Sequence, residues 1–432
     1  MSKSARHKID RRSFVGSSMA TGIAAGIIPA TNALASRSVN EEIAVGVMGL
    51  SRGRALAAAF AKEAGVRVKY VCDVDSQRAE STAKLLAKDN QPTPVAITDF
   101  RKMLEDPDVD AIVNATPNHW HGPATIMACS AGKNVYVEKP CCHNPREGEW
   151  MIAAARKNKK AVQVGTQRRS GQGWQEAVKR LRAGVIGRVY LARAWYDNAR
   201  GSIGTGKAAS VPDNLNYDLW QGPAPRLPYM SNRVHYNWHW FWHWGNGEVG
   251  NNGVHTIDLC RWGLNCDFPT RVTSSGGRYH FEDDQETPDT HCVSFEFQDR
   301  KQITWEGKSC NRHGGDFIKF YGDGGTMAVT AGGDFTILDP RDKQVDSYQA
   351  SARGDREHIL NFLDAIRNDK PLELNAEIAE GHKSTLLCHL GNIAQRTGRS
   401  LKCDPINGHI RGDSQAMELW GRDYEPGWEP KV

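Results

Sequence analysis

Beyond its N-terminus the sequence has no run of about eighteen apolar residues, so a membrane-spanning helix is not expected. It has no low-complexity tract and no internal repeat, which argues against a disordered or repeat-built chain. Its ten cysteines are scattered without a C-x-x-C pair, so they offer no zinc-site spacing and leave the disulfide content open. A composition of 39% hydrophobic and 24% charged residues over 432 positions is that of a globular protein long enough for two domains.

The first 35 residues have the features of an export signal. A basic start precedes a mildly apolar stretch from Phe14 to Pro29, and the small residues of 33–35 follow it. Within that start, Arg11 and Arg12 followed by Ser-Phe-Val resemble a twin-arginine signal. This resemblance implies export of a folded protein to the periplasm, together with any cofactor it has bound. The glycines in the stretch disfavour the alternative, an ordinary basic amphipathic helix.

The charge balance gives no reason to expect nucleic acid or an anionic membrane as a partner. The formal net charge is +5, and five basic residues against one acidic residue place +4 of it within residues 1–35. The rest of the chain therefore carries +5 less +4, or +1. Such a small excess creates no extended positive field.

From Glu41 the sequence alternates short apolar segments with helix-like stretches, the pattern of a parallel sheet with crossover helices. An alanine-rich helix is expected at 54–64, after the first strand. The expected strands are 43–48, 66–71, 111–115, 134–137 and 161–164. Residues 40–165 are therefore predicted to form a doubly wound Rossmann domain.

The turn after the first expected strand suits a dinucleotide pyrophosphate, which needs close backbone approach and the N–H groups of a helix N-terminus. Gly49 stands at the first fingerprint position, Ser51 replaces the second glycine, and Gly53 follows Arg52 one residue early for the third. Asp73 comes 24 residues after Gly49, at the tip of the next strand. A carboxylate there accepts hydrogen bonds from ribose hydroxyls and repels a 2′-phosphate, so NAD is favoured over NADP. The alternative is a solvated aspartate in the following turn.

Two later segments identify a family. Ala-Thr-Pro-Asn-His-Trp-His at 115–121 follows a buried strand, and Val-Tyr-Val-Glu-Lys-Pro at 135–140 ends the next one. With the turn at 49–53 they resemble the Gfo/Idh/MocA oxidoreductases, and the resemblance covers nearly the whole chain past residue 40. The further matching segments are 165–169, 184–187, 217–220 and 250–258. The resemblance implies an NAD(P)-dependent oxidoreductase with a Rossmann domain and a second α+β domain.

In this family a strand ending in Glu-Lys-Pro places a lysine beside the nicotinamide, which makes Lys139 the expected acid/base. Oxidation of a secondary alcohol needs a base for the hydroxyl proton, and a lysine can serve if burial and a nearby positive ring lower its pKa. Pro140 ends the strand, so Lys139 stays near the carboxyl edge, where doubly wound sheets bind ligands. The alternative is that Glu138 and Lys139 form an ordinary surface ion pair.

In the family, a second-domain motif supplies an aspartate and, four residues later, a histidine, and both reach the substrate. His255 matches the histidine, but the position four residues earlier is Asn251. On a helix the two would share a face, and an asparagine can hydrogen-bond a hydroxyl without acting as a base. The proton relay would then rest on Lys139 and His255, unless His255 is a core histidine. Asp258, on the same face, either orients His255 or caps a local network.

The resemblance also implies contacts to cofactor and substrate. Asn118 and His121 are placed to approach the nicotinamide ribose, whereas His119 suits a structural role. The residues expected to bind the cofactor are Gly49, Ser51, Arg52, Gly53, Asp73, Thr116, Asn118, His121 and Glu138. The residues expected to contact the substrate are Arg168, Tyr196 and Asp258, beside the catalytic Lys139, His255 and Asn251. No metal site is predicted.

Beyond residue 166 the sequence changes to β-rich segments with few helices between them. The expected strands are 189–196, 271–279, 290–297, 302–305 and 317–321, and helices are expected at 358–367 and 377–396. These features favour an α+β domain over 166–400 with a large, mainly antiparallel open sheet. In the family this domain binds substrate and forms oligomers, so a homodimer or homotetramer is expected. Residues 401–432 are predicted to form an ordered tail.

The segment 235–244 is the most unusual in the chain, since three histidines at a spacing of four alternate with tryptophans. A metal site is one interpretation, but no cysteine or paired carboxylate lies nearby. A carbohydrate platform is another, because aromatic faces suit the C–H faces of sugar rings. A buried aromatic seam at a domain or subunit interface is the third.

The leading hypothesis is NAD-dependent oxidation or reduction of a secondary hydroxyl on a sugar or polyol. A second is redox-neutral glycoside cleavage with tightly bound NAD, since some relatives oxidise, eliminate and reduce again with the same nucleotide. Export to a compartment without soluble NAD favours this second hypothesis, and Asn251 in place of aspartate is compatible with it. A third is a non-catalytic ligand-binding scaffold, against which an intact Lys139 argues.

Overall fold

The computed structural model of the chain describes residues 42–87, 92–312 and 317–432, which all belong to the unit Ser38–Val432. The export signal expected at 1–35 lies outside the described residues. None of the helices within these ranges combines the length and the apolar character needed to cross a membrane. All ten cysteines fall within the same ranges and are free thiols.

A six-stranded parallel sheet forms the first domain, in the order β3-β2-β1-β4-β5-β6. Its strands are β1 (Ile43–Met48), β2 (Val66–Cys72), β3 (Val95–Ile97), β4 (Ala111–Asn114), β5 (Asn134–Val137) and β6 (Val162–Val164). This doubly wound order reverses between β1 and β4 and leaves a crevice at the carboxyl ends of those strands. The predicted Rossmann fold is confirmed. β3 was not predicted from the sequence, because its first two residues are exposed and give no apolar signal.

The helices of this domain begin where the strands end. α1 (Arg52–Phe60) starts inside the glycine-rich turn, two residues before its expected start. Asp75 caps α2 (Ser76–Leu86) by accepting hydrogen bonds from the N–H groups of Gln77 and Arg78. The other helices are α3 (Arg101–Glu105), α4 (Asn118–Ser130) and α5 (Pro145–Asn158).

A nine-stranded sheet forms the second domain, in the order β14-β13-β12-β11-β7-β10-β9-β8-β15. β7 and β10 pair in parallel and the other neighbours are antiparallel, so the predicted, mainly antiparallel sheet is confirmed. Its strands are β7 (Val189–Asp197), β8 (Arg271–Gly277), β9 (Thr290–Phe297), β10 (Lys301–Lys308), β11 (Ile318–Gly322), β12 (Gly325–Val329), β13 (Phe335–Leu338), β14 (Gln344–Tyr348) and β15 (Leu401–Lys402). β12 to β15 were not anticipated. β14, for example, has four exposed residues of its five and therefore no buried face to mark it.

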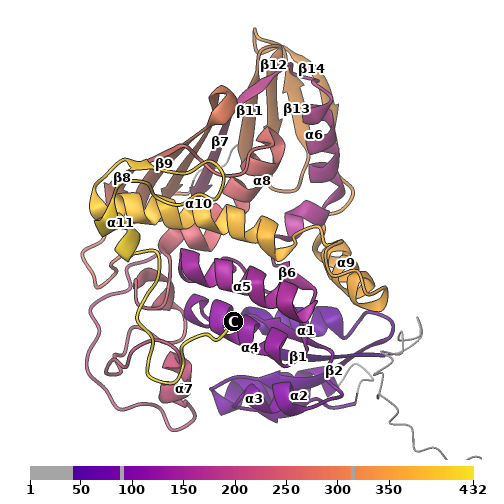
Figure 1. Ribbon diagram of the computed structural model, residues 1–432, viewed down its shortest axis with the longest axis vertical. Helices are drawn as coiled ribbons and strands as arrows, with labels where there is room; N and C mark the ends of the chain where they lie inside the picture. Colours follow the sequence, from indigo (N-terminus) through magenta and orange to yellow (C-terminus); the bar gives the residue numbers. More distant parts are fainter. Residues whose placement is uncertain (1–41, 88–91, 313–316) are drawn as a thin grey trace, which may run out of the picture. The chain divides into compact units, whose positions relative to one another are not determined.

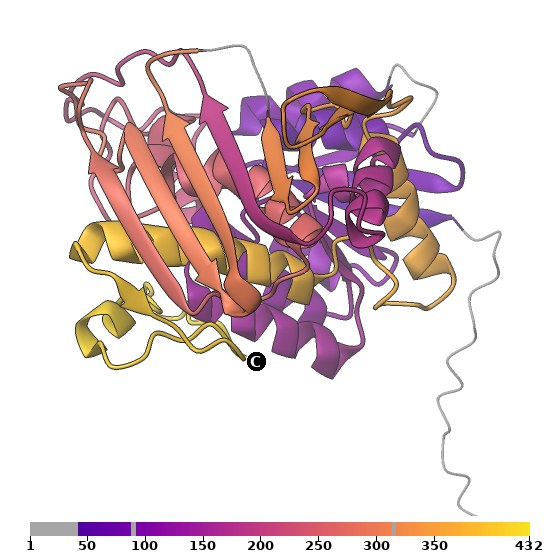
Figure 2. The ribbon, with the colours of Figure 1, turned by 90° about the horizontal axis from the view of Figure 1, so that it is seen from above.

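Helices cover one face of the second sheet. They are α6 (Gln172–Arg182), α8 (Val254–Leu264) and α10 (Ile378–Thr397). In Figure 1, α10 lies between the nine-stranded sheet and α5 of the first domain, and it contacts α5, α8 and β8. Figure 2 shows the opposite face of the sheet, which carries no helix of the described residues.

The end of the chain returns to both domains. α9 (Asp355–Arg367) places Phe362 in the core of the first domain, edge-on to Phe60 and Tyr136. β15 extends the second sheet beside β8, and Trp420 is buried in the second core. The remaining short elements are α7 (Tyr217–Gln221), α11 (Ser414–Glu418), the 3₁₀ turns η2 (Gln167–Ser170), η3 (Asn237–Trp240) and η5 (Gln298–Arg300), and the π-helical turn η4 (Val249–Gly253).

Candidate functional site

A cavity of about 520 Å³ opens at the carboxyl ends of the parallel strands. One wall is formed by the loops after β1, β2, β4 and β5, and the other by residues between 196 and 255. This is the edge at which doubly wound sheets bind dinucleotides. All the predicted site residues line this cavity except Gly53, Arg168 and Asp258.

The turn between β1 and α1 brings the backbone against the cavity. Gly49 has a φ of +82°, and a Cβ there would lie 2.5 Å from the carbonyl oxygen of Ala115, so only glycine fits. Residues 50–52 line the wall, and the start of α1 therefore borders the space. Gly53 lies behind them, where a Cβ would be 3.2 Å from Val47, and its lack of a side chain lets α1 pack closely on β1.

Asp73 lies just after β2 with its carboxylate tied to the backbone. Its Oδ2 accepts a hydrogen bond from the N–H of Leu50 at 2.7 Å, and its Oδ1 accepts one from the N–H of Asp75 at 3.0 Å. Burial raises the pKa of this carboxyl, which is only 9% exposed. Asp73 therefore braces the glycine-rich turn and still lines the cavity with its remaining lone pairs.

Residues 198–244, here called the strap, close this end of the cavity from the second domain. Segment 214–216 runs antiparallel to 74–76, with backbone hydrogen bonds of 2.9 and 3.0 Å between them. His235 lines the cavity, and its Nε2 lies 3.1 Å from Oδ2 of Asp75. The strap is thus fastened to the residues that immediately follow Asp73.

His121 joins the loop after β4 to the segment that carries Lys139. Its ring lies between two carbonyl oxygens, with Nδ1 2.6 Å from that of Pro140 and Nε2 2.8 Å from that of Thr116. Burial lowers the pKa of His121, so the neutral ring donates to one of the two oxygens at a time. Thr116 in turn donates its hydroxyl to Oδ1 of Asn114 at 2.6 Å.

Two further contacts stabilise the cavity wall. One links the two domains, and the other fixes the end of β5. Asn118 donates from Nδ2 to Oδ1 of Asn246 at 3.0 Å, which links α4 to the turn before η4. Arg52 donates from Nε to Glu138 at 3.2 Å, which ties the start of α1 to the residue after β5. His119 lies outside the cavity, with its Nε2 2.9 Å from a carbonyl oxygen of α7.

Lys139 reaches across the cavity from the end of β5. Its Nζ donates to the backbone oxygen of Asn251 at 2.7 Å and lies 3.3 Å from Oδ1 of the same residue. Burial lowers the pKa of this amine, while the carboxylates of Glu138 and Glu248 act in the opposite direction. Glu138 pairs with Arg52 rather than with Lys139. A partly buried lysine of this kind can exchange a proton with a bound hydroxyl group.

Asn251 and His255 come from a helix that begins with a wide turn. The π-helical turn η4 contains Asn251 and leads directly into α8, so the regular α-helical spacing assumed from the sequence does not apply. Wide turns of this type are frequent at functional sites. Here both the backbone and the side-chain oxygen of Asn251 face Lys139, and His255 lines the same cavity.

His255 faces the cavity as a neutral imidazole. Burial lowers its pKa well below the ordinary value, and the charges of Arg168 and Lys139 act in the same direction. Its Nδ1 is buried and has no hydrogen-bond partner among the described residues. A neutral ring beside Lys139 can hydrogen-bond a substrate hydroxyl without placing a second positive charge in the cavity.

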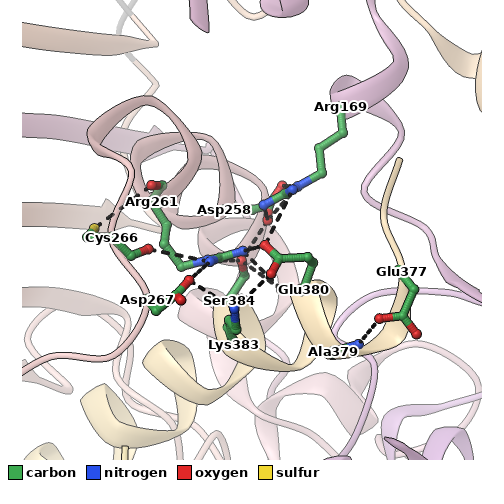
Figure 3. A network of polar contacts seen from close by, with 10 residues as sticks. All are labelled: Arg169, Asp258, Arg261, Cys266, Asp267, Glu377, Ala379, Glu380, Lys383 and Ser384. Atoms are coloured by element: carbon green, nitrogen blue, oxygen red, sulfur yellow. Dashed lines mark hydrogen bonds and ion pairs between the residues drawn. The ribbon is translucent and has the colours of Figure 1, made fainter. Parts of the chain in front are cut away.

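Asp258 lies away from the cavity, in a network of charged side chains (Figure 3). Arg169 donates to both of its carboxylate oxygens at 2.8 to 3.0 Å, and the hydroxyl of Ser384 donates at 2.6 Å. These bonds tie α8 to η2 and α10. The sequence left two roles open for Asp258, which were to orient His255 or to cap a local network. Its contacts are those of a local network.

Arg168 also lies off the cavity wall, whereas Tyr196 lies on it. Arg168 donates from Nε to the carbonyl oxygen of Ala331 at 3.4 Å, and its guanidinium lies 4.9 Å from the ring centre of Phe317. Its neighbour Gln167 lines the cavity instead. Tyr196 borders the cavity near the end of β7.

The strap and η4 supply cavity residues that the sequence analysis did not assign. They are Asn198, Arg200, Leu219, Trp220, His235, Tyr236, Trp238, His239 and Asn252. The alternation of histidine and tryptophan at 235–244 was the signal that could have found some of them. It could not separate the residues that face the cavity from those, such as Trp244, that are buried in an aromatic cluster.

The three histidines of this segment have different partners. His235 lies beside Asp75, His239 stacks on Trp238 with ring centres 3.6 Å apart, and Nε2 of His243 is 2.8 Å from a carbonyl oxygen. Burial lowers the pKa of His239 to about 3, so this ring is neutral as well. Across residues 42–87, 92–312 and 317–432, no group of three or more His, Cys, Asp or Glu side chains is placed to hold a metal ion.

Comparison with protein families covers both domains. Residues 43–166 match the Gfo/Idh/MocA model described as the NAD-binding Rossmann fold of an oxidoreductase family, and residues 194–429 match the model of its C-terminal alpha/beta domain. The chain belongs to the Gfo/Idh/MocA oxidoreductase family. It has the NAD-binding oxidoreductase fold of the Gfo/Idh/MocA proteins, and the cavity lies where that fold holds its nucleotide.

Several known proteins resemble the chain at low identity. Glycosyl hydrolase family 109 protein 1 from Shewanella sp. strain ANA-3 is 25% identical over 214 residues, or 44% of this chain. The match spans 46% of that protein, about half its length. Levoglucosan dehydrogenase in complex with NADH and levoglucosan has a TM-score of 0.65 at 18% identity, over 84% of this chain and 99% of that one. The WlbA dehydrogenase from Bordetella pertussis, in complex with NADH and UDP-GlcNAcA, has a TM-score of 0.64 at 18% identity and the same coverage.

Proposed function

We propose that the protein is a nicotinamide-dependent oxidoreductase that acts on a secondary hydroxyl of a sugar or other polyol. The observation that carries the proposal is the position of Lys139, whose amine lies in the cavity at the carboxyl edge of the parallel sheet, against Asn251. The family membership and the likeness to a dehydrogenase solved with NADH and levoglucosan support a carbohydrate substrate.

The residues at the end of the cavity near the glycine-rich turn fit a dinucleotide. We expect residues 49–52 to hold its pyrophosphate through the backbone and Asp73 to hold the adenosine ribose. When bound, the nicotinamide would supply the hydride chemistry. The carboxylate of Asp73 is fixed by two N–H groups, which supports NAD over NADP because a 2′-phosphate would meet that carboxylate.

Lys139 would move the proton. In the oxidation direction its neutral amine takes the hydroxyl proton, and in the reverse direction its ammonium form donates one to the carbonyl oxygen. Asn251 holds the amine in the cavity without competing for the proton, because amide oxygens are hydrogen-bond acceptors and not bases at neutral pH. The neutral His255 would hydrogen-bond the same hydroxyl.

A second candidate is glycoside cleavage without net redox change. The matched family 109 glycosyl hydrolase supports it. The strap supports it too, because its contacts with 74–76 would enclose a nucleotide and slow its exchange. We also propose, from Arg11 and Arg12, that residues 1–35 direct export, so that a nucleotide acquired before export would stay bound.

The test begins with the nucleotide that the purified protein releases on denaturation, identified by absorbance and mass. Intact protein is then given a panel of neutral sugars and glycosides. Net reduction of NAD supports the dehydrogenase, whereas release of an aglycone without net reduction supports redox-neutral cleavage. A protein that neither holds NAD nor binds it when it is added contradicts both.

Lys139→Met should lower either activity by about a thousandfold, because general acid–base catalysis is lost, while nucleotide binding remains. Lys133→Met is the matched control. Lys133 is buried, its pKa is also lowered by burial, and its Nζ donates to the carbonyl oxygen of Asp106 outside the cavity. Activity in the Lys139 variant equal to that of the control would remove the assigned role.

A further inference from the structure

Arg200 lines the same cavity as Lys139 and His255, and its guanidinium is held in place by other side chains. Its Nε and Nη2 donate to the carboxylate of Glu248 at 2.8 and 3.3 Å, and its Nη1 donates to the hydroxyl of Tyr236 at 2.8 Å. The group also lies 4.7 Å from the ring centre of Trp240. Among the described residues these bonds engage three of the five N–H groups, so two can donate to a ligand.

Glu248 stands behind this wall and does not line the cavity, and it is only 3% exposed. Its carboxylate also accepts a hydrogen bond from Nδ2 of Asn252, which does line the cavity. One of the two N–H groups on Nδ2 of Asn252 is therefore engaged, and its Oδ1 remains as an acceptor. One buried carboxylate thus holds both a donor, Arg200, and an acceptor, Asn252, on the cavity wall.

The positive charges of the arginines on the cavity wall are balanced. Each arginine among the described lining residues has a carboxylate partner within 4.0 Å. The pairs are Arg52 with Glu138 at 3.2 Å, Arg78 with Asp75 at 3.8 Å and Arg200 with Glu248 at 2.8 Å. Arg168, which also lies near His255, does not line the cavity.

We propose that Glu248 is a positioning residue that neutralises Arg200 and so makes the cavity select neutral sugars over uronates. This inference rests on the proposed sugar-handling function and specifies its substrate class. A hydroxyl group both donates and accepts, so it satisfies Asn252 and Arg200 together. A carboxylate can only accept, so it would leave the Oδ1 of Asn252 without a donor, and it would approach the buried Glu248. An arginine whose charge is already paired adds little attraction for a second anion.

The test compares binding of neutral methyl pyranosides with that of the corresponding methyl uronates, such as methyl glucoside and methyl glucuronide, by calorimetry on protein that holds NAD. We expect at least one neutral glycoside to bind about tenfold or more tightly than its uronate. Glu248→Gln removes the balancing charge and should shift the ratio toward the uronate by about tenfold. Arg200→Gln leaves Glu248 unpaired and should shift the ratio in the opposite direction. A purely structural defect would not reverse its sign between the two variants.

Glu63→Gln is the matched control, because Glu63 is a buried carboxylate that Arg356 holds with bonds of 3.0 and 3.1 Å outside the cavity. Its variant should leave the binding ratio unchanged. If Glu248→Gln does not fold, the wild-type preference for the neutral glycoside and the Arg200→Gln shift are measured together, and a wild-type preference for the uronate overturns the proposal. A wild-type preference for uronates, binding of no neutral glycoside, or equal shifts in all variants would overturn the proposal. Binding is measured without turnover, so these outcomes are separate from the Lys139 test of the proposed function.

Discussion

The glycine-rich turn at the nucleotide end of the cavity is held by a residue close in sequence, whereas the residues that hold the substrate end are far apart in sequence. Asp73 accepts its hydrogen bond from Leu50, 23 positions away, within one strand–turn–helix–strand unit. Lys139 donates to Asn251 across 112 positions, from the first domain to the second. Asp258, which anchors the helix that carries His255, bonds to Arg169 and Ser384 at separations of 89 and 126.

This difference separates what local structure can build from what requires the whole fold. The glycine-rich turn of the nucleotide end depends on local backbone and needs only glycine and a carboxylate at fixed offsets. The substrate end depends on how α8, α10 and the strap are held against the first domain. Substitutions at the nucleotide end should therefore change cofactor binding, and substitutions behind the substrate end should change stability or the chemistry of Lys139.

The substitution expected to have the largest effect is Asp258→Asn, which tests whether residues behind the substrate end control stability. The change removes the buried partner of Arg169, which is 5% exposed, and leaves it only the more distant and partly exposed carboxylate of Glu380 at 3.8 Å. We expect the free energy of unfolding to fall by about 3 kcal/mol, measured by urea denaturation, because removing one partner of a buried ion pair is costly. Asp99→Asn, which breaks the exposed pair with Arg101, should change it by less than about 1 kcal/mol. Unaltered stability with weaker sugar binding would instead place Asp258 in the substrate site.

A smaller effect is expected at the nucleotide end from Asp73→Ser. The shorter hydroxyl loses the charged hydrogen bonds to the N–H groups of Leu50 and Asp75 and those expected to the ribose. NAD should bind about tenfold more weakly, and its advantage over NADP should shrink. Titration of nucleotide-free protein with each dinucleotide measures both changes. Equal affinity for NAD in the variant and the wild type would show that Asp73 only braces the turn.

The smallest of these effects concerns the pH dependence of Lys139. Asn251→Asp places a carboxylate where an amide oxygen now lies 3.3 Å from Nζ. A negative charge stabilises the ammonium form and raises the lysine pKa, so the neutral amine forms only at higher pH. The rising limb of the pH–rate profile for oxidation should move upward by about one unit. A downward shift or none would mean that another group limits the rate.

The same contrast explains how much of the molecule could be predicted from its sequence. The parallel, doubly wound character of the first domain and the positions of Gly49, Asp73 and Lys139 follow from local patterns, because each of these residues lies where a strand meets a turn, whereas the largely exposed edge strand β3 gave no such signal. The orientation of a side chain within a helix does not follow in the same way. Asp258 shares a helix with His255, yet it is turned to Arg169 by contacts that no spacing in the sequence encodes.

Two other features escaped prediction for similar reasons. The π-helical turn η4 adds width to a helix whose residues look regular, and it decides which oxygens of Asn251 meet Lys139. Arg200 stands in an irregular segment beyond β7, and only its pairing with Glu248, 48 positions later, reveals why it is held at the cavity. Non-local contacts of this kind are visible only once the fold is known.

The central claim is that the amine of Lys139 exchanges the substrate proton while a nicotinamide lies beside it. The most direct measurement uses NAD-loaded protein and a neutral glycoside deuterated at its ring carbons, with mass analysis of the nucleotide after one turnover. We predict that the nucleotide of the wild type and of Lys133→Met acquires deuterium, whereas that of Lys139→Met does not on the same timescale. Deuterium transfer in the Lys139 variant at the wild-type rate would contradict the account.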